Sequence, residues 1–133
     1  MTKKRIDALT RLGRLQARMH ELGRWRLSAI EQEQASLGGD LRAVFEALES
    51  GDLAYGPQAK LSGRRVRALQ KQLDSLALES DDVRKKAKAH GISARLAEQA
   101  AETAGRRYRD DKERKELADL IERAIARRAA SST

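Results

Sequence analysis

A heptad repeat in the second half of the chain constrains its fold more than any other feature. The repeat positions alternate in steps of three and four residues, the spacing that lines up side chains along the packing face of a coiled-coil helix. They are Val66, Leu69, Leu73, Leu76, Ser80, Val83, Ala87, His90, Ala94, Ala97, Ala101, Ala104 and Tyr108. The face is rich in Leu and Val near the middle of the chain and mostly Ala beyond residue 87, so we expect a partner helix to approach closely there.

The repeat changes phase after Tyr108. Its next positions would be Asp111 and Lys115, which are charged. Apolar residues move instead to a different set of positions, namely Leu117, Leu120, Ile121, Ala124 and Ile125. The last segment therefore has its own apolar face.

The first half of the chain also has helical periodicity. Apolar residues fall on one face at steps of three and four. These positions are Leu12, Leu15, Met19, Leu22, Ala29 or Ile30, Leu37, Leu41, Val44 and Leu48. Gly38 and Gly39 interrupt the pattern, and each glycine costs about 1 kcal/mol relative to alanine inside a helix. The sequence leaves open a kink at this point or a true break, with Asp40 capping a new helix.

The stretch ESGDLAYGPQAK (residues 49–60) holds the only proline and the densest set of turn residues. Gly51 and Gly56 suit a chain reversal, and Pro57 suits the first turn of a helix. We therefore predict an all-α fold, a long antiparallel two-helix coiled-coil hairpin. It forms a single domain over residues 1–133, with helix one at about 4–49, a turn at 50–56 and helix two at about 57–128. The alternative is a four-helix bundle, broken near Gly38–Gly39 and Gly91.

Charge is distributed unevenly along the chain. The net charge is +8, of which residues 1–26 contribute +6, residues 27–60 contribute −4 and residues 61–133 contribute +6. In an antiparallel hairpin, residue i lies opposite roughly residue 107 − i. This register brings an N-terminal basic cluster near basic residues of the second helix. The N-terminal cluster is Lys3, Lys4, Arg5, Arg11 and Arg14. The residues of the second helix are Arg106, Arg107, Arg109, Arg127 and Arg128. The hairpin thus predicts one basic end that contains both chain termini.

No constellation for catalysis is recognisable in the sequence. The absence of Cys excludes disulfides and Cys-ligated zinc. His20 and His90 are the only histidines, and without neighbouring ligands they suit polar packing positions that fix register better than a metal site. The chain also lacks the spacing and lysine of a phosphate-binding loop. We therefore predict no enzymatic activity, no catalytic residues, no cofactor and no metal.

Three kinds of partner remain open from the residues alone. A basic helical tip is steered electrostatically toward an acidic protein surface. The clusters GRRVRALQK, VRKKAKAH and GRRYRDDKERK also suit nucleic-acid phosphates, although acidic residues are interspersed in the third. A structural coiled-coil adaptor is the other alternative, and its main observable property is self-association.

The pattern of the chain resembles a known family. Basic N-terminal heptads, a polar break near a Tyr and the ending ERKELADLIERAIARRAA are similar to the FliJ/YscO family of stalk proteins of flagellar and type III secretion export. The ending gives the closest similarity, through Leu117, Ala118, Asp119, Ile121, Ala124, Arg127 and Arg128.

This resemblance implies a non-enzymatic coiled-coil stalk whose terminal end binds a hexameric export ATPase and couples it to an export-gate protein. Export chaperones are a further class of partner. The location implied is cytoplasmic, at the periphery of the inner-membrane export machinery, without membrane insertion. The residues expected to face the ATPase are Arg5, Arg11, Arg14, Arg18, Arg106, Arg107, Arg127 and Arg128.

Overall fold

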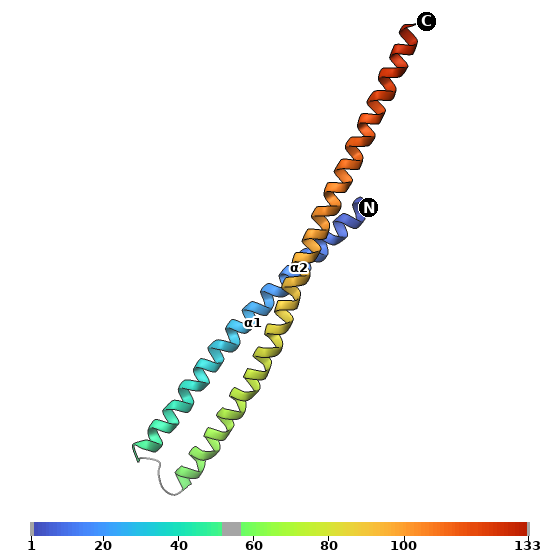
Figure 1. The fold of residues 1–133 in the computed structure, drawn as a ribbon. Coiled ribbons are helices and arrows are strands. Elements are labelled where there is room, and N and C mark those ends of the chain that lie inside the picture. Colours follow the sequence, from blue (N-terminus) through green and yellow to red (C-terminus); the bar gives the residue numbers. More distant parts are fainter. Residues whose placement is uncertain (1, 52–56, 133) are drawn as a thin grey trace. The chain divides into compact units, whose positions relative to one another are not determined.

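The structure is a computed structural model that describes residues 2–51 and 57–132, with side chains described from residue 60 in the second range. Two helices account for nearly all of these residues, α1 (Lys3–Glu49) and α2 (Pro57–Ser131), and no strand occurs among them. The helices run antiparallel and pack against each other (Figure 1). The predicted all-α helical hairpin is confirmed.

Local hydrogen bonds define the ends of α1. At its start, the carbonyl oxygen of Thr2 accepts hydrogen bonds from the amides of Arg5 and Ile6 at 3.0 and 3.2 Å. At its end, the amide of Gly51 donates to the carbonyl of Leu48 at 3.2 Å, and Gly51 has a φ of +81°. This left-handed conformation is the one in which glycine commonly ends a helix. Of the turn predicted at 50–56, residues 52–56 lie outside the described residues.

Neither glycine site breaks a helix. Helix α1 continues through Gly38 and Gly39, and α2 continues through Gly91, so the four-helix alternative is wrong. A glycine costs about 1 kcal/mol inside a helix, which packing on both sides can offset. Half-buried Leu37 and Leu41 flank the glycine pair of α1 and supply such packing.

The chain divides into two compact units, each built from a segment of α1 and a segment of α2. Unit 1 comprises Met1–Ala17 and Ile92–Thr133, and unit 2 comprises Arg18–Gly91. Unit 1 carries fifteen basic and nine acidic residues, so its net charge is +6, whereas that of unit 2 is +2. The basic excess therefore belongs mainly to unit 1.

The packing face predicted for α2 is confirmed from Val66 to Ala104, since each of its positions is buried or half-buried. Ser62, which is 7% exposed, extends the face by one step toward the start of the helix. Tyr108 was expected to belong to it but is 38% exposed, because the face ends at Ala104.

The face predicted for α1 is correct only in its second part. Leu37, Leu41, Val44 and Leu48 are half-buried, and Ile30 rather than Ala29 is the buried residue. In the first part, the leucines and the methionine are exposed: Leu12 by 46%, Leu15 by 57%, Met19 by 41% and Leu22 by 42%. Their place is taken by neighbouring positions, namely Gly13, Gln16, His20, Gly23 and Leu27, which are half-buried.

Close approach of the backbones explains this exchange. In unit 2, a Cβ added to Gly23 would lie only 2.7 Å from the Cβ of Ala87. A leucine does not fit in such a space, so the small residue packs inward and the large apolar residues lie on an adjacent face. The alanine-rich part of α2 thus pairs with glycines, and the predicted close approach is present.

Candidate protein-binding surface

The register of unit 1 follows from its closest helix contact. A Cβ added to Gly13 would lie 3.5 Å from the Cβ of Ala97. Residue i of α1 therefore lies opposite about residue 110 − i of α2, and the expected value of 107 − i was about three residues too low. In this register, Lys3 lies opposite about Arg107.

Unit 1 brings together some of the predicted arginines. Arg5, Arg11 and Arg14 are exposed on α1, and Arg106 and Arg107 are exposed on the facing part of α2. In this register, Arg11 and Arg14 lie opposite about residues 99 and 96, seven to ten residues along α2 from Arg106. Arg5 lies opposite about Gly105, next to Arg106 and Arg107. This juxtaposition agrees with the expected meeting of two basic regions.

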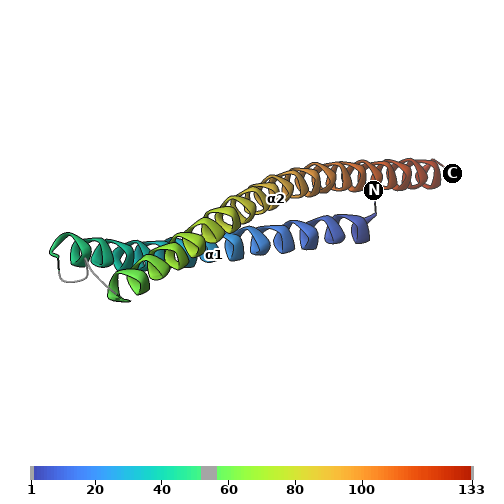
Figure 2. The same ribbon diagram turned by 90° about the horizontal axis from the view of Figure 1, so that it is seen from below.

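Arg127 and Arg128 do not join this cluster. They lie twenty or more residues beyond the point that faces Lys3, which corresponds to about 30 Å along a helix at 1.5 Å per residue. The part of α2 that carries them extends past the start of α1, and no other helix of the described residues lies beside it (Figures 1 and 2). The predicted single tip is therefore two basic regions on one unit.

Most of the predicted arginines lack a carboxylate partner. Arg106 donates a hydrogen bond to Glu102 at 2.6 Å. Arg18, which belongs to unit 2, lies 3.6 Å from Glu21, and its guanidinium carbon is 5.4 Å from the ring centre of Trp25. Within the described residues, the other six have no ion pair: Arg5, Arg11, Arg14, Arg107, Arg127 and Arg128. Their charges are therefore available to an external partner.

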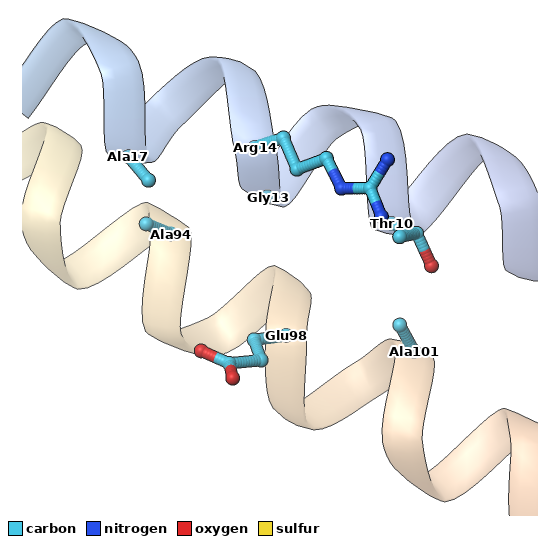
Figure 3. Close-up of a pocket in the computed structure, with 7 residues that line it drawn as sticks. All are labelled: Thr10, Gly13, Arg14, Ala17, Ala94, Glu98 and Ala101. Carbon is cyan, nitrogen blue, oxygen red and sulfur yellow. The ribbon is translucent and has the colours of Figure 1, made fainter.

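A shallow groove of about 330 Å³ lies between the helices of unit 1 (Figure 3). Its lining is Thr10, Gly13, Arg14, Ala17, Ala94, Glu98 and Ala101. Figure 3 shows the Arg14 side chain extending toward Thr10, while the Glu98 carboxylate points away from it. The Thr10 hydroxyl is already used, because it donates to the carbonyl of Ile6 at 3.0 Å. The sequence signal for this groove is the set of glycine and alanine positions that leave space between the helices.

The free part of α2 is exposed along its whole length. Every described residue from Arg106 onward is exposed. The largest apolar side chains on it are Leu117, Leu120, Ile121 and Ile125, which are 51–63% exposed. The apolar face predicted for this segment is thus present with no part of α1 covering it.

His20 joins the two helices of unit 2. Its Nδ1–H donates a hydrogen bond to the carbonyl oxygen of Ala87, with the two atoms 2.6 Å apart. Gly91 leaves room for the ring, since an added Cβ there would lie 3.0 Å from Nδ1. His20 therefore has the contacts of a residue that fixes register, although it lies outside the apolar face predicted for α1.

Within residues 2–51 and 57–132, no three His, Cys, Asp or Glu side chains come together in a way that can hold a metal ion. In the same ranges, no helix contains a stretch that is long and apolar enough to cross a bilayer.

Comparison of the chain with protein-family models, curated proteins and solved structures finds no match.

Proposed function

We propose that this protein is a non-enzymatic coiled-coil stalk of a bacterial flagellar or type III export apparatus, which binds a hexameric export ATPase through its basic terminal unit. In this proposal it also couples the ATPase to the export gate and works at the cytoplasmic periphery of the inner membrane. The observation that carries the proposal is the charge of unit 1, which is +6 over residues that include most of the unpaired arginines.

Unpaired, exposed arginines favour recognition of an acidic protein surface. A guanidinium group forms two parallel hydrogen bonds with a carboxylate, and these charge-assisted bonds are stronger than neutral ones. Arg5, Arg11 and Arg14 have no intramolecular ion pair to break before they bind, among the residues that the structure describes. A mostly positive unit also increases the rate of association with an acidic ring.

Because the two basic regions of unit 1 are separate, the charge of each can be reversed in a variant of its own. One variant carries Arg11→Glu and Arg14→Glu, and a second carries Arg127→Glu and Arg128→Glu. The matched control carries Arg64→Glu and Arg65→Glu, the same charge change at exposed positions of α2 in unit 2. Each purified protein is added to the purified export ATPase encoded in the same genome, and ATP hydrolysis is measured against its concentration.

We expect the control to stimulate hydrolysis like the original protein. Reversal of either unit 1 pair should raise the half-maximal concentration about tenfold or more, since each lost charged hydrogen bond contributes about 1.5–3 kcal/mol. Equal stimulation by all four proteins contradicts the proposed role of unit 1.

Nucleic-acid binding is the alternative that the same charge supports. Unit 1 also contains nine acidic residues, which oppose contact with a phosphate backbone. Fluorescence anisotropy with labelled single-stranded RNA and duplex DNA at physiological salt distinguishes nucleic-acid binding from the proposed binding to the ATPase. Tight binding whose affinity falls steeply with salt, together with no effect on the ATPase, favours nucleic acid.

A further inference from the structure

We propose that the free part of α2 binds the same segment of a second copy of this protein, antiparallel, through the apolar face around Leu117 and Ile121. This segment begins just past the residue that faces the start of α1 in the register of unit 1, at about residue 107. Leu117, Leu120, Ile121 and Ile125 are all more than half exposed there. The inference does not rest on the proposed export function.

The segment has a heptad seam of its own. Its positions, in alternating steps of four and three, are Asp110, Arg114, Leu117, Ile121, Ala124 and Arg128. Antiparallel pairing of two copies maps this seam onto itself when residue i lies opposite residue 238 − i. Leu117 of each copy then packs against Ile121 of the other, which places the two apolar pairs at the centre.

Charge complementarity supports this register. It places Asp110 of each copy opposite Arg128 of the other, so an ion pair closes each end of the interface. Positions that flank the seam on one side face their equivalents in an antiparallel pair. Glu113 therefore lies beside Arg127 of the second copy, and Leu120 lies beside Leu120.

A parallel pair lacks this complementarity. In register, it places Asp110 opposite Asp110, Arg114 opposite Arg114 and Arg128 opposite Arg128. Like charges that face each other destabilise a helix pair. The sequence of the segment therefore selects the antiparallel orientation.

The interface is short, so the dimer should be weak. Specific stable interfaces bury about 1,600 Å² in total, and here four large apolar side chains of each copy supply most of the apolar surface. We expect an equilibrium between monomer and dimer that depends on protein concentration.

The test uses sedimentation velocity of the full chain, from about 5 to about 500 µM, the range in which weak dimers form. Asp110→Arg places two arginines at each end of the proposed interface, and Arg128→Asp places two aspartates there. Each variant alone should dimerise about tenfold more weakly than the original protein, because two exposed ion pairs become two repulsions. An equimolar mixture of the two variants restores opposite charges at both ends and should dimerise like the original.

In the mixture, each chain still carries its own substitution. Recovery of dimerisation there therefore shows that the substitutions act on the contact between two chains and not on the fold of one chain. Ile121→Glu should abolish the dimer, whereas Leu78→Glu, at a 74% exposed position of unit 2, should leave it unchanged. A protein that stays monomeric up to the highest concentration overturns the inference. A mixture that associates no better than the separate variants also overturns it.

Failure of this test leaves the proposed export function standing. A chain that dimerises but does not stimulate the ATPase contradicts only that function. The two proposals are therefore tested separately.

Discussion

The close contact between Gly23 and Ala87 makes a sharp prediction about stability. Alanine normally stabilises a helix relative to glycine by about 1 kcal/mol. At Gly39, where an added Cβ meets nothing within 4 Å, we expect Gly39→Ala to stabilise the protein by about this amount. At Gly23, the added Cβ would lie 2.7 Å from the Cβ of Ala87, closer than two carbon atoms approach without a shift.

The difference between the two variants can be worked out from these contacts. Helix propensity contributes equally to both, so it cancels. Overpacking typically costs about 1–3 kcal/mol, and here it applies to Gly23 alone. The free energy of unfolding of Gly23→Ala should therefore be about 1–3 kcal/mol lower than that of Gly39→Ala. Adding Ala87→Gly to Gly23→Ala removes the clash and should recover part of this loss.

Urea unfolding followed by circular dichroism at 222 nm measures these differences, with all variants at one protein concentration. Gly13→Ala is a second control, because its added Cβ would make an ordinary 3.5 Å contact with Ala97. If Gly23→Ala stabilises the protein as much as Gly39→Ala does, the close packing of α1 and α2 in unit 2 is wrong.

Two other predictions test which residues of α1 face α2. Ile30→Ala should destabilise the protein by about 2–5 kcal/mol, because Ile30 is 0% exposed, whereas Leu15→Ala, at a 57% exposed position, should cost less than about 0.5 kcal/mol in the same urea titration. The chain has no cysteine, so Gly13→Cys with Ala97→Cys should form a disulfide on mild oxidation, since 3.5 Å between Cβ atoms lies within the usual range. Leu12→Cys with Ala97→Cys should not, and the opposite result on a non-reducing gel contradicts the register of unit 1.

The sequence predicts the fold well where large residues line the packing face. The alternating steps from Val66 to Leu76 identify buried and half-buried positions of α2, because packing these Leu and Val side chains against α1 removes apolar area from water. The same reasoning locates Leu37, Leu41, Val44 and Leu48 on α1. In these stretches, hydrophobicity and burial coincide.

On α1, the prediction fails where glycines line the packing face, whereas the alanine positions from Ala87 to Ala104 on α2 are predicted correctly. Between Leu12 and Leu22, the most apolar stripe of α1 is exposed, and Gly13 and Gly23 pack against alanines instead. Glycine and alanine carry little hydrophobic signal, so periodicity alone selects the neighbouring leucines. The spacing of the alanines on α2 predicted a close approach, but it did not show which residues of α1 make it.

The candidate surface was predictable in its composition but not in its geometry. The arginines stand out in the sequence, and the hairpin brings Arg5 close to Arg106 and Arg107 in unit 1. The distance to Arg127 and Arg128 depends on the register of the two helices, which the apolar pattern alone does not determine. The unpaired state of these arginines also depends on side-chain contacts that no sequence pattern specifies.

Stimulation of the export ATPase tests the central claim most directly. We expect Arg11→Glu with Arg14→Glu to shift half-maximal stimulation to about tenfold higher protein concentration or more, and Arg64→Glu with Arg65→Glu to leave it unchanged. Stimulation by the unit 1 variant at the same concentration as the original protein, or no stimulation by the original protein itself, contradicts the claim.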